Sequence, residues 1–255
     1  MEAPQKIAVA GATGRVGRHI VDVLTERGHD VVPISRSHGV DVITGEGLTD
    51  ALTGVDRIVD AATGPSPEEA PATAFFTTAT RNLHEAGEQA GARQMIVLSI
   101  IGTDRFAGGY GAAKLAHERA ALAGPLPVRV LRAAQFHEFV PQLVEWGTQG
   151  EVAYVTDMRT QPVAARAVAE AVADLVAAPA TGGEPISEVA GPREESLVDA
   201  AALFAARRGL AVKVEGVRDP DDPDLDVYMG GGLLPGPDAI LAGPTFEEWL
   251  DAESS

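Results

Sequence analysis

Residues 6–17 read Lys-Ile-Ala-Val-Ala-Gly-Ala-Thr-Gly-Arg-Val-Gly, and they begin the strongest structural pattern in the sequence. Its first five residues are typical of a short buried strand, and the three glycines that follow are typical of a tight turn. An amphipathic stretch then runs over 16–28, and a second apolar run covers 31–34. Strand, glycine-rich turn, helix and strand in this order predict a βαβ unit.

The same alternation of apolar runs and amphipathic stretches continues along the chain. Further strands are expected over 40–43, 57–62, 94–99, 128–131, 152–155 and 186–189. Further helices are expected over 48–52, 70–90, 110–123, 139–146, 163–178 and 196–208, with a last short helix after Thr245. Strands that are continuous apolar runs belong to a parallel sheet covered on both faces, so we expect a doubly wound α/β fold.

The pattern loosens after residue 132, and the segment 218–244 is rich in Pro, Gly and Asp. We expect residues 1–255 to form a single domain. Within it, 133–162 and 186–255 are expected to add a small C-terminal region that caps a substrate pocket over the open end of the sheet. Most of 218–244 is expected to be irregular.

The charge balance limits the partners that this chain can have. The net charge is -17, from 37 acidic and 20 basic residues. A field of this sign repels phosphate backbones and anionic lipid surfaces, so the expected partner is a small molecule, with no nucleic acid and no membrane. We expect a cytoplasmic protein, because no long apolar run and no secretory signal is visible. The oligomeric state is not predicted.

Metal chemistry is not expected either. The chain has no cysteine, and its six histidines lack the spacing of metal ligands. The acidic stretch 219–226 has only a superficial likeness to a calcium loop, because the glycine and glutamate that such a loop requires are absent.

The glycine-rich turn has the chemistry of a dinucleotide site. Gly11 would permit the tight turn, Gly14 would let the backbone approach a diphosphate, and Gly17 would let the helix pack closely on the strand. The start of the helix offers free N–H groups to phosphates. The turn residues expected to contact the cofactor also include Thr13, Arg15 and Val16. A purely structural turn is the alternative, but the surrounding βαβ unit favours the cofactor site.

The end of the second strand bears on which cofactor is bound. An acidic residue here would bind the ribose 2′-hydroxyl of NAD, whereas an arginine would accommodate the 2′-phosphate of NADP. The chain has Ser35, Arg36 and Ser37 at this place and no acid. The prediction is therefore NADP(H), with NAD(H) as a possibility; a solvated loop arginine is the alternative reading.

A third motif carries the chemistry of proton transfer. Tyr110 and Lys114 are spaced to share one face of a helix, in a chain with only three tyrosines and three lysines. We expect the ammonium to lower the phenol pKa, so that Tyr110 exchanges a proton with a carbonyl or hydroxyl. Ser99 ends the preceding strand, and its hydroxyl would hold the substrate oxygen. The alternative is an exposed tyrosine beside a surface lysine.

These motifs resemble the short-chain dehydrogenase/reductase superfamily and, within it, the atypical NmrA-like branch of NAD(P)-binding proteins. The resemblance rests on GATGRVG at 11–17, VDAAT at 59–63, VLSIIG at 97–102, YGAAK at 110–114, LRAAQFHEF at 131–139, QPVAA at 161–165 and the closing TFEEWL. It covers most of the chain and implies a Rossmann fold.

The resemblance also implies roles for single residues. The cofactor residues are Gly11, Gly14 and Gly17 for the diphosphate, Arg36 for the adenosine end, and Ala61, Ala62 and Thr63 along the cofactor. Lys114 would bind the nicotinamide ribose, Tyr110 would be the acid/base, and Ser99 would be its partner. Asn82 lies inside a long helix, where it either anchors a water relay, as in related reductases, or is solvated.

The loop after the strand ending at Leu131 supplies the candidate substrate contacts, which are Gln135, Phe136 and His137. A lone histidine is more often structural, and this alternative stays open for His137. The function that the sequence favours is an NADPH-dependent oxidoreductase that reduces a small-molecule carbonyl, enone or quinone. The alternatives are an epimerase or dehydratase that uses the same three residues, and a non-enzymatic NADP(H)-binding redox sensor.

Overall fold

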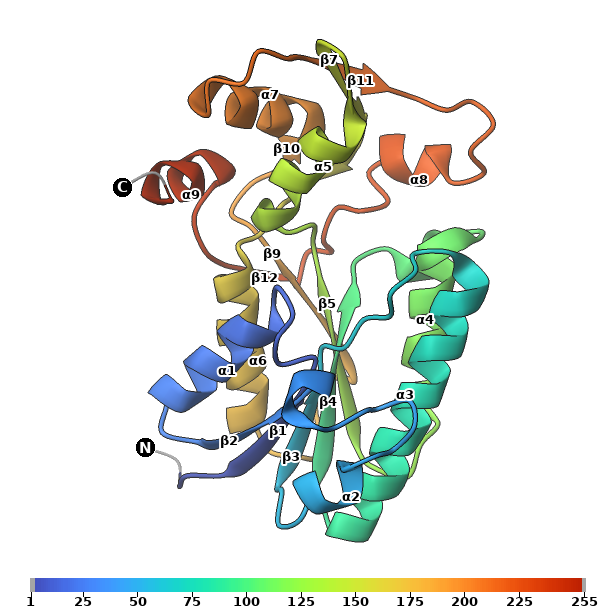
Figure 1. Cartoon of the computed structure of the whole chain (residues 1–255), viewed down its shortest axis with the longest axis vertical. Coiled ribbons are helices and arrows are strands. Elements are labelled where there is room, and N and C mark those ends of the chain that lie inside the picture. The colour runs from blue at the N-terminus through green and yellow to red at the C-terminus, as the bar shows by residue number, and fades with distance from the viewer. Residues whose placement is uncertain (1–2, 254–255) are drawn as a thin grey trace.

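The computed structural model describes residues 3–253, and its centre is a seven-stranded parallel sheet (Figure 1). The strand order is β12-β9-β5-β4-β3-β1-β2. The bounds of these strands are β1 Lys6–Ala10, β2 Asp30–Ile34, β3 Arg57–Asp60, β4 Gln94–Ile100, β5 Val128–Ala133, β9 Ile186–Ala190 and β12 Ile240–Leu241. Every pairing in this sheet is parallel, which confirms the predicted doubly wound α/β fold.

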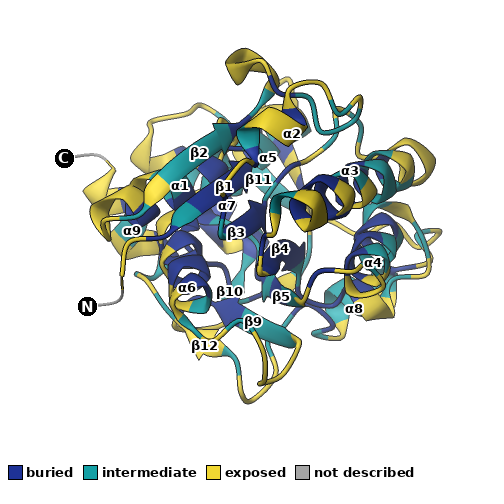
Figure 2. Ribbon diagram, turned by 90° about the horizontal axis from the view of Figure 1, so that it is seen from below, coloured by how far each residue is buried: buried dark blue, intermediate teal, exposed yellow. Residues whose placement is uncertain are grey.

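Helices cover both faces of the sheet, as Figure 2 shows with the buried strands between exposed outer helix faces. One face carries α1 (Gly17–Glu26) and α6 (Ala165–Ala177). The other face carries α2 (Leu48–Ala51), α3 (Glu69–Ala90) and α4 (Gly109–Leu122).

Alternate residues of each strand enter the two hydrophobic cores. In β4, for example, Ile96 faces α1 and α6 while Met95 and Val97 face α3 and α4. The strands are buried on both sides for this reason, which explains their continuous apolar sequence.

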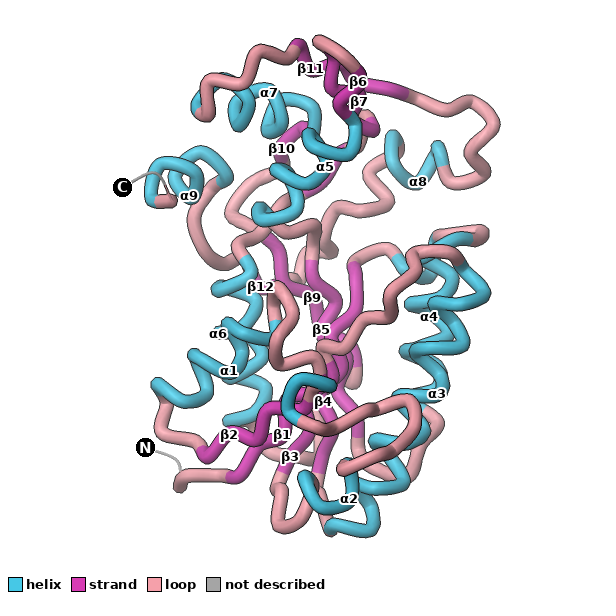
Figure 3. Tube along the Cα trace, in the orientation of Figure 1, coloured by secondary structure: helices cyan, strands magenta, loops and turns pink. Residues whose placement is uncertain are grey.

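A small lobe stands at the carboxyl end of the sheet (Figures 1 and 3). Its helices are α5 (Val140–Gly147), α7 (Leu197–Arg207), α8 (Leu225–Met229) and α9 (Phe246–Ala252). Its strands are β6 Thr148–Gln149, β7 Val152–Thr156 and β11 Lys213–Val217 in one sheet, and β8 Arg159–Thr160 with β10 Glu195–Ser196 in another. Short 3₁₀ turns lie at η1 Arg36–His38, η2 Thr103–Arg105 and η3 His137–Phe139.

Side-chain hydrogen bonds cap the first turns of two helices of this lobe. The hydroxyl of Ser196 accepts a hydrogen bond from the amide of Asp199 at the start of α7. Thr245 and Glu248 form a complete capping box at the start of α9. Both capping pairs follow from the sequence because a cap depends on residues three apart.

The segment 218–244 is less irregular than expected, since it contains α8 and β12.

The strand expected over 40–43 is wrong. Residues 41–44 form a turn, in which the Asp41 carboxylate accepts hydrogen bonds from the amides of Ile43 (2.7 Å) and Thr44 (3.3 Å). An aspartate that bonds to the backbone two residues on favours such a turn over a strand. As a result β2 is the edge of the sheet.

Asn82 of α3 holds this turn from the other side. Its side-chain amide donates to the carbonyls of Val42 and Ile43, both at 2.9 Å. These two bonds give Asn82 a structural role in place of the water relay considered from the sequence.

Among the helices of residues 3–253, none has both the length and the apolar character needed to cross a bilayer.

Candidate functional site

β1 and β3 are neighbours in the sheet, and the connections that leave their carboxyl ends run in opposite directions. The chain runs from β1 to β2 on one side and then returns to place β3 on the other side of β1. Such a reversal of strand order opens a crevice that binds ligands in doubly wound sheets. The glycine-rich turn follows β1, and Ala61 and Ala62 follow β3, so the sequence-predicted cofactor residues meet at this crevice.

The turn has no room for side chains at two of its glycines. Gly11 has φ +77°, and a Cβ there would lie 2.7 Å from the Ala61 carbonyl oxygen. A Cβ on Gly17 would lie 2.0 Å from the Gly11 carbonyl oxygen. Both glycines are therefore required for the close approach of turn, helix and strand.

The outer part of the turn suits a phosphate group. Gly14 is exposed, and its amide donates to the Gly11 carbonyl at 2.9 Å. The amides of Arg15 and Val16, just before α1, have no acceptor within residues 3–253. Free amides at the start of a helix bind anions, so these residues fit a diphosphate.

Two further turn residues differ in their surroundings. Thr13 is exposed at the crevice. The Arg15 guanidinium donates to the Gln142 side chain at 2.6 Å and lies 5.8 Å from the centre of the Phe139 ring. Arg15 thus connects the glycine-rich turn to the small lobe.

The end of β2 presents an arginine without an acidic partner. Arg36 begins the η1 turn, is exposed, and forms no ion pair with any residue of 3–253. Beside it, the Ser35 hydroxyl bonds to the Ser37 hydroxyl (2.8 Å) and to Nδ1 of His38 (2.7 Å). A planar cation flanked by hydroxyls suits a phosphate monoester.

Tyr110, Lys114 and His117 of α4 all contact one aromatic ring. The Phe76 ring of α3 meets Tyr110 edge-on at 5.9 Å and stacks on His117 at 4.7 Å. Nζ of Lys114 lies 4.4 Å from the centre of the same ring. The Tyr110 side chain is half-buried, whereas Lys114 is 4% exposed.

The ammonium of Lys114 is engaged inside the protein. It donates to the Leu98 carbonyl at 2.7 Å and to Nδ1 of His117 at 2.9 Å. Burial lowers the pKa of Lys114 to about 8. Burial also raises the pKa of Tyr110, so the expectation that Lys114 lowers it is not met in this structure.

Ser99 lies one residue before the end of β4 and follows Leu98, whose carbonyl accepts the hydrogen bond from Lys114. Its side chain is buried, and Oγ has no hydrogen-bond partner within residues 3–253. A buried hydroxyl without a partner is costly, and it marks a place where a ligand oxygen could be bound.

Sequence reasoning missed two members of this site, His117 and Asp60. Nε2 of His117 lies 3.1 Å from the Asp60 carboxylate at the end of β3. The spacing of Lys114 and His117 places both on one face of α4, which was a usable signal. Its partner Asp60 lies within the VDAAT motif, but it is 57 residues from His117, so no local spacing linked the two.

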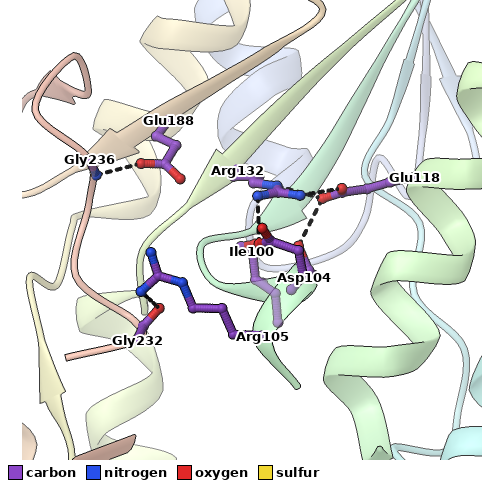
Figure 4. A network of polar contacts seen from close by, with 9 residues as sticks. Ile100, Asp104, Arg105, Glu118, Arg132, Glu188, Gly232 and Gly236 are labelled. Atoms are coloured by element: carbon purple, nitrogen blue, oxygen red, sulfur yellow. Dashed lines mark hydrogen bonds and ion pairs between the residues drawn. The ribbon is translucent and has the colours of Figure 1, made fainter. Parts of the chain in front are cut away.

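A polar network fixes the loop between Ser99 and Tyr110 (Figure 4). Glu118 of α4 accepts two hydrogen bonds from Arg132 of β5, at 3.0 and 2.8 Å. Arg132 also donates to Asp104 (2.9 Å), and the Thr103 hydroxyl donates to Glu118 (3.1 Å). The network joins this loop to a strand and a helix, so Tyr110 follows a well-anchored segment.

The small lobe closes the other side of the same loop. Arg105 donates to the Gly232 carbonyl at 3.1 Å (Figure 4). The Ala107 amide donates to the Asp224 carboxylate at 2.6 Å. A cavity of about 400 Å³ lies between the loop, the start of α4 and α8. Its walls include Ile100, Phe106, Tyr110 and Tyr228, together with Asp222 and Asp224.

The three residues predicted to contact substrate lie outside this cavity. Gln135 accepts a hydrogen bond from the Thr160 hydroxyl, and Phe136 packs on the core beside α1 and α6. His137 has no exposed surface; its Nε2 bonds to the Pro244 carbonyl at 3.1 Å. It packs against Phe246 and Trp249. His137 is thus a core residue that joins η3 to α9, which corrects the prediction that it touches substrate.

No group of three or more His, Asp or Glu side chains that could hold a metal ion occurs within the described residues 3–253.

The structure resembles those of several known enzymes. The dTDP-4-dehydrorhamnose reductase of Clostridium acetobutylicum has a TM-score of 0.75 at 18% identity, over 98% of this chain and 100% of that one. The dTDP-4-dehydrorhamnose reductase of Bacillus anthracis, in complex with NADP, has 0.69 at 17%, over 98% of both chains. The UDP-N-acetylglucosamine 4-epimerase of Bacillus cereus has 0.71 at 17%, over 97% and 94%.

These likenesses show a common fold and do not single out the NmrA-like branch. No curated protein sequence matches the chain. The sequence model of the NAD(P)H-binding family matches residues 11–179, which include the glycine-rich turn, Arg36, Ser99, Tyr110 and Lys114. Because this match covers well over half of the sequence, the protein belongs to the NAD(P)H-binding family.

Proposed function

We propose that this protein is an NADPH-dependent reductase of a small uncharged carbonyl, enone or quinone. The observation that carries the proposal is the position of Tyr110. Its side chain lines the cavity at the carboxyl end of the sheet, while Lys114 and the unpartnered hydroxyl of Ser99 lie buried at the end of β4. A phenol, a hydroxyl and a cation near a dinucleotide crevice suit reduction of a carbonyl.

Backbone amides of the glycine-rich turn and the Arg36 guanidinium would together bind the cofactor. The free amides beside Gly14 would bind the diphosphate, and Arg36 would bind the 2′-phosphate. Ala61, Ala62 and Thr63 would line the crevice, and Lys114 would bind the nicotinamide ribose. When bound, the nicotinamide supplies a hydride.

The protonation of Tyr110 favours the reductive direction. Because burial raises the pKa of this phenol, it keeps its proton at neutral pH. A neutral phenol donates a proton to the substrate oxygen, as reduction requires, and is a poor base for the reverse reaction. The Ser99 hydroxyl would hold the same oxygen in place.

The cavity walls favour an uncharged substrate. Aromatic and aliphatic side chains line it, and its charged lining residues are Asp222 and Asp224. The described lining residues include no lysine or arginine. A diphosphate would meet carboxylates without cations to offset them, so the substrate class differs from the sugar nucleotides in the names of the structural neighbours.

Tyr110→Phe tests the catalytic role. Turnover of NADPH with a panel of quinones, enones and diketones is expected to fall by at least about 100-fold, because general acid catalysis contributes that much. Calorimetry should give an unchanged Kd for NADPH. Tyr154→Phe is the matched control, since Tyr154 is an exposed tyrosine of β7.

Two results would contradict the proposal. Full turnover by Tyr110→Phe would remove this residue from the chemistry. Tight NADPH binding with different affinities for the oxidised and reduced cofactor, and no turnover with any compound, would favour the redox-sensor alternative.

A further inference from the structure

A buried chain of polar groups links β3 to Lys114. The Asp60 carboxylate lies 3.1 Å from Nε2 of His117, and Nδ1 of His117 lies 2.9 Å from Nζ of Lys114. The other Asp60 oxygen accepts a hydrogen bond from the Ala62 amide at 3.0 Å. The residues Asp60, His117 and Lys114 that make up this hydrogen-bonded series are each at most 4% exposed.

The positions of the protons in the hydrogen bonds between Lys114, His117 and Asp60 follow by elimination. An ammonium only donates, so Nδ1 of His117 must accept from Lys114. The neutral imidazole then carries its proton on Nε2 and donates it to Asp60. Burial and the neighbouring charge of Lys114 lower the pKa of His117, which keeps the ring neutral. Although burial alone would raise it, the bond from His117 holds the pKa of Asp60 below its usual value.

The Lys114 ammonium has three contacts inside the protein. It donates two hydrogen bonds, to the Leu98 carbonyl and to His117, and Nζ lies 4.4 Å from the centre of the Phe76 ring, so one proton is left for a ligand. Because Phe76 also stacks on His117 at an angle of 9°, the imidazole plane is fixed. This geometry sets the direction of both hydrogen bonds that the ring makes.

Asp60 is the carboxylate that is free to balance Lys114. The other nearby acid, Glu118, is already bound to Arg132 by two hydrogen bonds. The remaining titratable groups that face this cluster are Tyr110 on α4 and His84 on α3. A buried charge without a counter-charge is costly, whereas three apolar side chains could fill the same space without this cost.

We propose that Asp60 and His117 are a positioning pair for Lys114. Asp60, acting through the imidazole, is the counter-charge that keeps the ammonium charged and fixes it at the carboxyl end of β4. The proposal rests on the proposed function for the part that Lys114 plays in cofactor binding. Its test does not depend on turnover, so the two can fail separately.

The chain suits a direct test by NMR because it has only three lysines, Lys6, Lys114 and Lys213. In protein labelled at lysine, the Lys114 side chain is expected to titrate near pH 8, well before Lys213, whose pKa is raised by its bond to Glu215. In Asp60→Asn the Lys114 midpoint should fall by about one pH unit or more, because an opposite charge has been removed.

Variants of His117 separate positioning from packing. His117→Leu fills the space but breaks the connection, so the Lys114 midpoint should fall as in Asp60→Asn. His117→Gln keeps one acceptor and one donor and should restore most of the wild-type midpoint. His84→Gln is the matched control, since His84 is also a buried histidine, bound instead to the Ala121 carbonyl at 2.9 Å. It should leave the midpoint unchanged.

An unchanged Lys114 midpoint in both Asp60→Asn and His117→Leu would overturn the proposal. If these variants do not fold, nitrogen NMR of His117 in the wild-type protein tests the proposal. The proposal requires His117 to be neutral at pH 7 with its proton on Nε2. A proton on Nδ1, or a charged ring, would overturn it.

Discussion

We propose that Arg36 determines the choice between NADPH and NADH. Nine other arginines form ion pairs with carboxylates within the described residues, whereas Arg36 is exposed and forms none. A guanidinium kept free of acidic partners at the end of β2 is available to a 2′-phosphate.

Arg36→Ala should weaken NADPH binding about ten- to a hundredfold, the worth of one charge-assisted contact. NADH binding should barely change, because NADH lacks the 2′-phosphate. Isothermal calorimetry with both cofactors measures the two effects. Arg119→Ala is the control, since Arg119 is an exposed arginine of α4 without an ion pair in the described chain. Equal weakening of both cofactors would contradict the role given to Arg36.

For individual residues of the site, the sequence predicted their positions better than their contacts. The glycines of the turn and Arg36 depend on local geometry, which neighbours in the chain determine. The state of Lys114 depends on Leu98, Phe76 and Asp60, which come from three other elements. Packing between distant elements is not visible in a spacing of four residues, so neither the buried ammonium nor the role of His117 could be predicted.

The loop from Ser99 to Tyr110 shows how elements position the site. It is short and rich in glycine, yet Arg132 and Glu118 bind it from β5 and α4 (Figure 4). The side chain of Glu118 is 2% exposed and that of Arg132 is 11% exposed, so both charges depend on each other.

Arg132→Met should lower the free energy of unfolding by about 3–5 kcal/mol, because it leaves the Glu118 charge buried without a partner. The double variant with Glu118→Met should recover most of this loss, since it removes both charges. Urea unfolding measures both. A double variant that is less stable than Arg132→Met would show that the ion pair itself is the main contribution.

The expected strand over 40–43 was wrong because contacts between elements determine the structure there. Its apolar residues fit a strand, but Asp41 and Asn82 bind the backbone in a turn. Half of that interaction comes from α3, so the apolar pattern alone could not reveal it. The parallel strands of the sheet centre were predicted well because their burial on both faces leaves a continuous apolar signal.

For the whole molecule, the net charge of -17 opposes any anionic ligand. Preference for a cofactor with an additional phosphate must therefore come from local cations and helix amides. The small lobe adds the carboxylates of Asp222 and Asp224 to the cavity, so the cavity lining also opposes an anionic ligand.

Three buried histidines should make the protein unstable in acid. Burial lowers the pKa of His84, His117 and His137 below the ordinary value of 6.5. Below pH 6.5 the unfolded chain binds protons that the folded chain does not, so the free energy of unfolding falls as the pH falls. The loss is up to about 1.4 kcal/mol per pH unit for each fully buried histidine.

Urea unfolding at several pH values between 7.5 and 5 measures this dependence. His137→Gln, which can keep the bond to the Pro244 carbonyl, should make the loss of stability with falling pH shallower. His38→Gln is the control, because His38 is exposed at the η1 turn. A slope that His137→Gln leaves unchanged would show that His137 is charged in the folded protein.

The most direct test of the central claim is a calorimetric titration of the unmodified protein with NADPH and with NADH under the same salt conditions. We expect one binding site per chain and an affinity for NADPH at least about tenfold greater than that for NADH, since one charge-assisted contact separates the two cofactors. Equal affinities, or tighter binding of NADH, would contradict the assignment of Arg36 and the NADPH-dependent function built on it.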